Sequence, residues 1–283
     1  MSSPQKNGEV ANSYAAQSSS IPAIQLHYGP EPLQFGELYV PDGPGPHPVV
    51  LLIHGGFWRA RYGLSLMTGL ARDLAERGIA AWNIEYRRIG DDGGGWPGTL
   101  QDVALAADYL RTIGSTYAID PQRVVAVGHS AGGHLALWLA ARPGIALDSP
   151  VRVGNTPLSL MGVISLAGAN DLKHVWQLRL SGDVVIEFLG GTPNDVPERY
   201  ATASPAAFLP LRVPQVLIHG TDDFNVPLIV SRAYARKAKE AGDPVTLIEL
   251  ANAEHFVVID PHSWAWKIIV GEIQKLLGLT MNV

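Results

Sequence analysis

Short apolar segments recur along the chain, and between them apolar residues return every three or four positions. Several short segments, such as residues 49–54 and 124–129, are apolar without a break instead of alternating with polar residues. Continuous runs of this length are typical of strands covered on both faces, as in a parallel sheet. The pattern predicts strands at residues 23–28, 35–40, 49–54, 79–85, 124–129, 162–166, 215–219 and 245–250.

The stretches between these strands have the apolar spacing of helices that pack one face against a core. They predict helices over residues 64–77, 99–113, 131–141, 228–241 and 263–277. Because strands and helices alternate, we expect an α/β fold whose sheet has about eight strands, is mostly parallel, and carries helices on both faces. No helical pattern separates the first two strands, so an antiparallel hairpin is expected at that edge.

The domain organisation follows from two segments that lack this alternation. Residues 143–213 are irregular, with four prolines after a Gly-Gly pair, and we expect a cap-like insertion containing short helices over the carboxyl edge of the sheet. Residues 1–20 are rich in Ser, Gln, Asn and Ala and lack the charged and apolar regions of a signal peptide. We expect a disordered tail at 1–20 and one domain at 21–283.

Composition excludes several classes of function. The chain has no cysteine, so disulfides and thiolate sites are ruled out, and its Lys and Arg are scattered in a chain of net charge −5. Neither nucleic acid nor a membrane surface is therefore an expected partner. No metal motif or phosphate loop occurs, so we expect no metal and no cofactor. These features predict a cytoplasmic monomer or homodimer that acts on a small molecule.

The first chemical signal is the pentapeptide at 128–132, which has the pattern G-x-S-x-G and joins a predicted strand to a predicted helix. In such a turn the small residues let strand and helix approach closely, and the serine hydroxyl stands exposed at the sheet edge. The start of the helix also favours developing negative charge. We interpret Ser130 as a nucleophile and the N–H group of Ala131 as one donor to an oxyanion.

The second signal is the turn at 54–58, with the sequence His-Gly-Gly-Phe-Trp, directly after a predicted strand. Glycines allow the backbone to approach a substrate closely, so Gly56 and Phe57 are candidates for further oxyanion donors. A tentative substrate pocket combines aromatic and imidazole side chains from several loops: Trp58, Trp96, His174, Trp176 and Phe224.

The base and the acid come from loops after the last two predicted strands. Of the nine histidines, only His255 follows a strand late in the chain and comes after an acidic residue, so it is the candidate general base. Asp222 and Asp223 compete for the acid that orients it, and Asp171 is the next candidate. The histidines at 54, 129 and 219 are expected to hydrogen-bond within the framework, and His134 is expected in the core.

Together these motifs resemble the H-G-G-x-W esterase/lipase branch of the α/β hydrolases, which includes kynurenine formamidase and many bacterial carboxylesterases. The resemblance extends from about Leu33 to the C-terminus, and the order of Ser130, acid and His255 is the order of that superfamily. The branch carries an H-G-x-x-D-x-x-V-P pattern, which Asp223 matches and Asp222 does not. The branch also carries a short G-x-x-H-F loop around the histidine, and this chain has Asn252 at the glycine position.

The resemblance implies an α/β-hydrolase fold and a serine hydrolase that works through an acyl-enzyme intermediate, with Ser130, His255 and Asp223 as the catalytic residues. A carboxylesterase acting on small esters is the expected activity. The alternatives are an aryl formamidase that cleaves N-formylkynurenine, and then a peptidase or lactonase. No extended apolar lid segment stands out, which disfavours a long-chain lipase.

Overall fold

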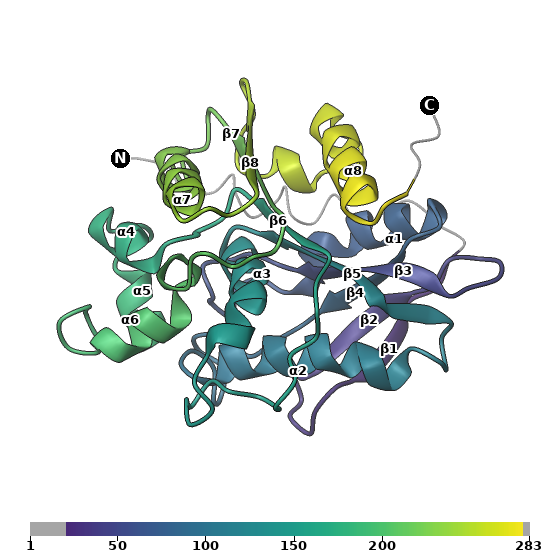
Figure 1. Cartoon of the computed structure of the whole chain (residues 1–283), viewed down its shortest axis with the longest axis horizontal. Coiled ribbons are helices and arrows are strands. Elements are labelled where there is room, and N and C mark those ends of the chain that lie inside the picture. Colours follow the sequence, from purple (N-terminus) through teal and green to yellow (C-terminus); the bar gives the residue numbers. More distant parts are fainter. Residues whose placement is uncertain (1–20, 280–283) are drawn as a thin grey trace.

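A single eight-stranded sheet runs through the protein in the computed structural model, which describes residues 21–279 (Figure 1). The strand order is β1-β2-β4-β3-β5-β6-β7-β8. Strand β2 is antiparallel to β1 and β4, and every other pair of neighbours is parallel. The strands are β1 (Ile24–His27), β2 (Phe35–Tyr39), β3 (His47–Ile53), β4 (Ala80–Ile84), β5 (Ile119–His129), β6 (Gly162–Leu166), β7 (Gln215–Gly220) and β8 (Val245–Leu250).

Helices cover both faces of the sheet and bury two separate apolar clusters against it. Residues of α2, α3 and α7 pack on one face, and residues of α1 and α8 pack on the other. The helices are α1 (Thr68–Glu76), α2 (Gly98–Ile113), α3 (Ala131–Ala141), α4 (Leu172–Gln177), α5 (Val184–Leu189), α6 (Pro197–Ala203), α7 (Ile229–Glu240) and α8 (Trp264–Leu276), with 3₁₀ turns η2 (Leu64–Met67), η3 (Arg142–Gly144), η4 (Pro205–Ala207) and η5 (Val257–Ile259).

Strand β3 shows why the central strands are apolar without a break. Its residues Val49, Leu51 and Ile53 point into the first cluster, whereas Val50 and Leu52 point into the second. All five are fully buried, because successive side chains of a strand face opposite sides of the sheet. Burial of both faces thus leaves no position in this stretch where a polar residue would meet solvent.

The predicted fold class and the N-terminal hairpin are confirmed. Differences are confined to the ends of elements. The helix predicted at 64–77 begins with the 3₁₀ turn η2 before α1, and β5 extends back to Ile119 because His47 of β3 pairs with it. The tail predicted for residues 1–20 lies outside the described residues.

Three short helices, α4 to α6, lie in the irregular segment 143–213. Helix α5 packs on loops at the carboxyl edge of the sheet, because the Phe188 carbonyl accepts a hydrogen bond from the Trp96 N–H at 2.9 Å. The Phe188 ring also stacks on Trp58, with 4.8 Å between ring centroids. These contacts place the segment beside the loops that follow β3 and β4. A cap-like role for it stays a prediction.

Helix α3 carries a core histidine, as the sequence predicted. His134 is fully buried; its Nε2 lies 2.8 Å from the carbonyl of Ala203, and its Nδ1 accepts a hydrogen bond from the Trp58 indole N–H at 3.3 Å. Burial lowers the pKa of His134 to about 4, and the hydrogen bond to Ala203 offsets only part of that effect. The side chain is therefore neutral in the folded protein at neutral pH.

Protonation of His134 in the unfolded chain makes stability depend on pH. Imidazole in an unfolded chain has a pKa of about 6.5, so between about 6.5 and the folded value the unfolded state binds the extra proton and stability falls with falling pH. His134→Gln keeps a donor and an acceptor but does not titrate. Between pH 7 and pH 5 we expect the wild-type free energy of unfolding to drop by about 2 kcal/mol more than that of the variant. Urea unfolding at both pH values measures this, and equal drops would contradict it.

Candidate active site

A strained turn places Ser130 at the carboxyl edge of the sheet, between β5 and α3. Its backbone has φ 56° and ψ −116°, a conformation that residues other than glycine rarely adopt. The turn is held by neighbouring backbone, because the Ser130 N–H donates to the Leu166 carbonyl at 2.8 Å and its own carbonyl accepts from the N–H of Ala169 at 3.2 Å. Both partners belong to the end of β6 and the loop after it, so β6 fixes the turn from one side.

Two glycines allow the first turn of α3 to pass directly against the strands. A Cβ atom on Gly132 would lie 2.1 Å from the carbonyl oxygen of Ile53, the last residue of β3. A Cβ atom on Gly128 would lie 2.0 Å from the carbonyl oxygen of Gly132. Neither distance is compatible with a side chain, so the G-x-S-x-G pattern is a packing requirement of this turn.

The loops after β7 and β8 bring a histidine and an aspartate together. The N–H of Asp222 donates to the carbonyl of Ala253 at 3.1 Å, and the N–H of Asn252 donates to the Thr221 hydroxyl at 2.9 Å. Joined in this way, the loops hold His255 Nδ1 2.6 Å from the Asp223 carboxylate. Both side chains are nearly buried.

The Asp223 carboxylate is surrounded by donors. One oxygen accepts the backbone N–H groups of Asn225 and Val226, each at 2.9 Å, and the other lies 3.1 Å from His219 Nε2 as well as beside His255. Burial by itself would raise the pKa of Asp223, but the hydrogen bonds from His219 and His255 hold it well below its usual range. An ionised acceptor at this position keeps the proton of neutral His255 on Nδ1, which leaves Nε2 free to accept a proton.

The structure distinguishes between the competing aspartates. Asp222 is exposed and bonds to Thr221, whereas Asp171 caps α4 and pairs with Lys237 at 2.6 Å. Only Asp223 reaches His255.

The backbone conformation explains why an asparagine can replace the glycine of the family's G-x-x-H-F loop. Asn252 adopts φ 57°, in the left-handed region. Asparagine tolerates that region better than most other residues with a side chain. The substitution therefore preserves the conformation of the turn that carries His255.

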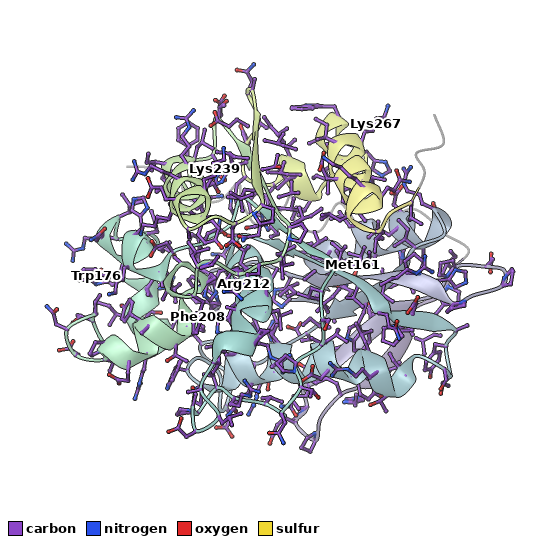
Figure 2. The ribbon with its side chains drawn as sticks, in the orientation of Figure 1. Met161, Trp176, Phe208, Arg212, Lys239 and Lys267 are labelled. Atoms are coloured by element: carbon purple, nitrogen blue, oxygen red, sulfur yellow. The ribbon has the colours of Figure 1, made fainter. Side chains whose placement is uncertain are left out.

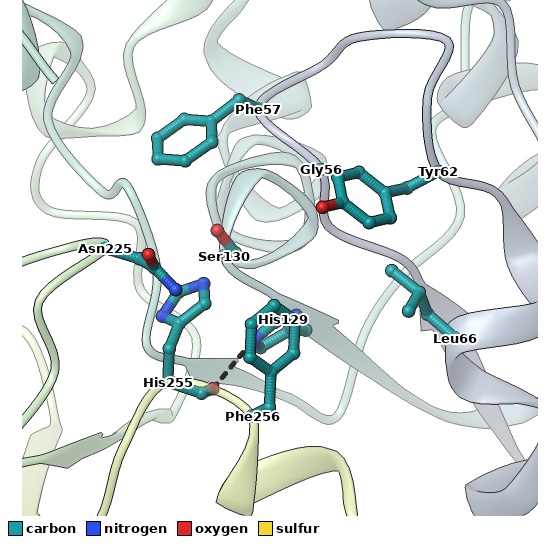
Figure 3. Close-up of a pocket in the computed structure, with 9 residues that line it drawn as sticks. All are labelled: Gly56, Phe57, Tyr62, Leu66, His129, Ser130, Asn225, His255 and Phe256. Atoms are coloured by element: carbon teal, nitrogen blue, oxygen red, sulfur yellow. Dashed lines mark hydrogen bonds between the residues drawn. The ribbon is translucent and has the colours of Figure 1, made fainter. Parts of the chain in front are cut away.

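Ser130 and His255 line one pocket, with an empty volume of about 440 Å³ that includes its open mouth. In Figure 3, Phe57 and Asn225 lie on one side of the Ser130 hydroxyl, and Tyr62 and Leu66 lie on the other, with the Tyr62 hydroxyl directed toward Ser130. The pocket wall is thus mainly aromatic and aliphatic. The lining residues are Gly56, Phe57, Tyr62, Leu66, His129, Ser130, Asn225, His255 and Phe256.

None of the five tentative pocket residues lines this pocket, and the two tryptophans at positions 58 and 96 serve packing. Trp58 is fully buried between Phe188 and the core of α3. Trp96 lies beside α5, where the Arg199 guanidinium sits 5.9 Å from the centre of its ring. An aromatic residue in a loop motif is equally suited to a core or a pocket, so the sequence does not distinguish the two roles.

The other three tentative residues also lie outside the pocket. His174 and Trp176 belong to α4, and Figure 2 shows Trp176 at the edge of the molecule in this view. Phe224 is 89% exposed and is not among the lining residues, whereas its neighbour Asn225 lines the pocket. The sequence analysis did not assign five lining residues to the pocket. Two of them, Tyr62 and Leu66, lie after the turn at 54–58. The other three lie within or beside the motifs of the catalytic residues: His129, Asn225 and Phe256.

A buried glutamate holds the loop that supplies Gly56, Phe57, Tyr62 and Leu66. One Glu85 oxygen lies 2.8 Å from His54 Nε2 and 3.2 Å from the Arg88 guanidinium, and the other accepts the N–H of Leu64 at 3.1 Å. Arg88 in turn donates to the backbone carbonyl of Tyr62. Both ends of the loop are therefore attached to the residues that follow β4.

Within residues 21–279, no group of three or more His, Asp or Glu side chains is arranged to hold a metal ion. In the same range, no helix has the length and apolar character needed to cross a membrane.

Comparison with known families finds a match over most of the chain. The model of the BD-FAE family matches residues 37–237, which is well over half of the chain. The chain belongs to the BD-FAE family. The matched region includes Ser130 and Asp223, and His255 lies beyond it.

Curated relatives of this BD-FAE member include two named as esterases. A probable isoprenylcysteine alpha-carbonyl methylesterase ICME of Oryza sativa subsp. japonica is 28% identical over 241 residues, covering 81% of this chain and 56% of the relative. Esterase LipQ of Mycobacterium tuberculosis is 28% identical over 256 residues, covering 86% of this chain and 58% of the relative. The chain thus spans little more than half the length of these relatives.

Solved structures share the fold. A truncated carbohydrate esterase from gut microbiota superposes with a TM-score of 0.81 at 21% identity, covering 93% of this chain and 99% of that one. A propionate-bound thermophilic esterase, Est2 of Thermogutta terrifontis, has a TM-score of 0.73 at 23% identity and covers 92% of this chain and 96% of its own.

The turn geometry predicts that a single methyl group on Gly132 disrupts the site. In Gly132→Ala the new Cβ meets the Ile53 carbonyl, so we expect the free energy of unfolding to fall by at least about 3 kcal/mol. The matched control is Gly78→Ala, where φ is 82° but no atom lies within 4 Å. Its loss should be about 1 kcal/mol, from backbone strain alone. Urea unfolding compares the two, and equal losses would show that the close contact carries no special cost.

Proposed function

We propose that this BD-FAE protein is a serine esterase that hydrolyses small carboxylic esters, with Ser130 as nucleophile, His255 as general base and Asp223 as the acid that orients the histidine. The observation that carries the proposal is the 2.6 Å hydrogen bond between His255 and Asp223, because His255 lines the same pocket as Ser130. A histidine whose Nδ1 is fixed by an ionised carboxylate offers Nε2 as a base to a neighbouring hydroxyl.

In the first step His255 Nε2 takes the proton of Ser130 while the serine oxygen forms a bond to the acyl carbon. The tetrahedral intermediate then collapses, the bond to the alcohol oxygen breaks, and His255 returns the proton to that oxygen. Water repeats the attack on the acyl-enzyme and releases the acid. Throughout, Asp223 stabilises the imidazolium form of His255, and its low pKa keeps the proton on the histidine.

Backbone N–H groups near Ser130 are suited to bind the negative oxygen of the intermediate. Among the described residues, the N–H groups of Gly56, Phe57 and Ala131 have no hydrogen-bond acceptor. Gly56 and Phe57 both have positive φ, 118° and 53°. This backbone forms a tight turn that lines the pocket. We assign these three groups to the oxyanion site, where preorganised donors stabilise charge that develops in the transition state.

The pocket supports a small ester as substrate. Its apolar wall, formed by Phe57, Tyr62, Leu66 and Phe256, suits a short acyl chain or the apolar part of an alcohol. The names of the rice and mycobacterial relatives describe ester hydrolysis, and the Thermogutta enzyme was solved with propionate bound.

Replacing the nucleophile tests the proposal. We expect wild-type protein to hydrolyse p-nitrophenyl acetate and butyrate, and Ser130→Ala to lose about 10⁴-fold or more of kcat, because no covalent intermediate forms. N-formylkynurenine serves as the comparison substrate, and we expect it to be cleaved far more slowly than the esters. Ester turnover that survives in the variant would overturn the proposal, and preferential formamide cleavage would make the protein an aryl formamidase.

The adjacent aspartates provide a matched pair of variants. Asp223→Asn removes the charge that fixes the histidine, so we expect kcat to fall by about 10³- to 10⁴-fold. Asp222→Asn alters an exposed carboxylate of equal size one residue away and should change kcat by less than about twofold. Steady-state kinetics on p-nitrophenyl butyrate separates them. A larger loss in the Asp222 variant would show that the acid is misassigned.

A further inference from the structure

The residue before the nucleophile, His129, touches the loop of the general base. It ends β5, is 1% exposed, and its Nε2 lies 3.0 Å from the backbone carbonyl of His255 (Figure 3). A carbonyl oxygen accepts hydrogen bonds and never donates them, so His129 Nε2 carries the hydrogen. The side chain is thus a donor that joins the strand end beside Ser130 to the loop of His255.

The surroundings of His129 keep it uncharged. Burial lowers its pKa well below the ordinary value, and the neighbouring His255 lowers it further. Its ring packs against His255 and Phe256, with 4.5 and 5.7 Å between ring centroids. On its other side Gly55 packs so closely that a Cβ there would lie 2.9 Å from His129 Nδ1. A neutral donor can therefore hold the loop without repelling the imidazolium that His255 becomes during catalysis.

The other hydrogen bonds of this loop come from a different part of the sheet. Within residues 21–279, the bonds of Asn252, Ala253 and the His255 ring to other loops all lead to the loop after β7. The bond from His129 is the one that leads to β5, the strand that carries Ser130. Without it, His255 would be fixed relative to Asp223 but less firmly relative to the nucleophile.

We propose that His129 is a positioning residue that sets the distance between His255 and Ser130. The inference rests on the proposed esterase function and adds a residue that acts through His255 without touching the substrate's reacting atoms. Proton transfer is sensitive to placement, and a shift of about 1 Å in a catalytic group costs about 100-fold in rate. Because the base acts in the transition state, the effect belongs in kcat and leaves KM nearly unchanged.

The test compares His129→Leu, which fills a similar volume without a donor, with His129→Gln, which keeps an amide donor at the position of Nε2. With p-nitrophenyl butyrate we expect kcat of the leucine variant to fall by about 10- to 100-fold, with KM within about threefold, and the glutamine variant to recover most of the loss. His47→Leu is the control, because His47 is a buried histidine at the first residue of β3, at the end of that strand away from the active-site loops. Its kcat should change by less than about twofold.

Thermal unfolding of each variant separates positioning from stability. If His129→Leu does not fold, His129→Asn replaces it, because the shorter amide does not reach the His255 carbonyl. Equal kcat in the variants with and without the donor, at equal unfolding temperatures, would overturn the inference. So would a loss that appears in KM alone. Either result leaves the esterase proposal intact as long as Ser130→Ala is inactive, whereas turnover in Ser130→Ala would overturn that proposal itself.

Discussion

The strained turn at Ser130 is the constraint on which the rest of the structure depends. A non-glycine residue in such a conformation costs about 1–3 kcal/mol and persists only where surrounding packing fixes it. Helix α3 supplies that packing, since every one of its residues is buried. Strand β5 lies between β3 and β6, so the turn meets backbone from both neighbours. The central position of β5 in the sheet thus stabilises a strained serine that borders the pocket.

A second constraint is the burial of the Asp223 carboxylate, which requires donors in place of water. Part of that requirement is met by a buried polar chain that starts away from the pocket. The Asn170 amide donates to the Ser231 hydroxyl at 3.3 Å, and Ser231 lies 2.7 Å from His219 Nδ1, on the far side of the ring from Asp223. The Val226 carbonyl, which can only accept, lies 2.8 Å from His219 Nε2, so His219 carries its hydrogen on Nε2, which also lies 3.1 Å from the Asp223 carboxylate. Nδ1 is then an acceptor, and the Ser231 hydroxyl donates to it. This tautomer helps to keep the carboxylate ionised.

The sequence predicted those parts of the site that depend on local pattern. The strand that precedes Ser130 and the loop of His255 are marked by short apolar runs, and the turn around Ser130 needs small residues at fixed spacing. Asp223 required a family pattern as well, because its neighbour Asp222 has the same chemistry. The pocket wall was not predictable in this way. Tyr62 and Leu66 reach the pocket because Glu85 and Arg88, some 20 residues away in the chain, hold their loop in place.

The separation between the catalytic groups and the wall has a structural consequence. Ser130, Asp223 and His255 follow β5, β7 and β8, whereas Tyr62 and Leu66 belong to the loop after β3 that is attached to the residues after β4. A change in the size of Tyr62 or Leu66 therefore alters the space beside Ser130 without moving the bond between His255 and Asp223. His129 lies where the two sets meet, packed on Gly55 of the wall loop and bonded to His255. A buried, uncharged histidine suits this position for two reasons. A charge on His129 would oppose the imidazolium form of His255, and a small residue would lack the hydrogen bond to the His255 loop.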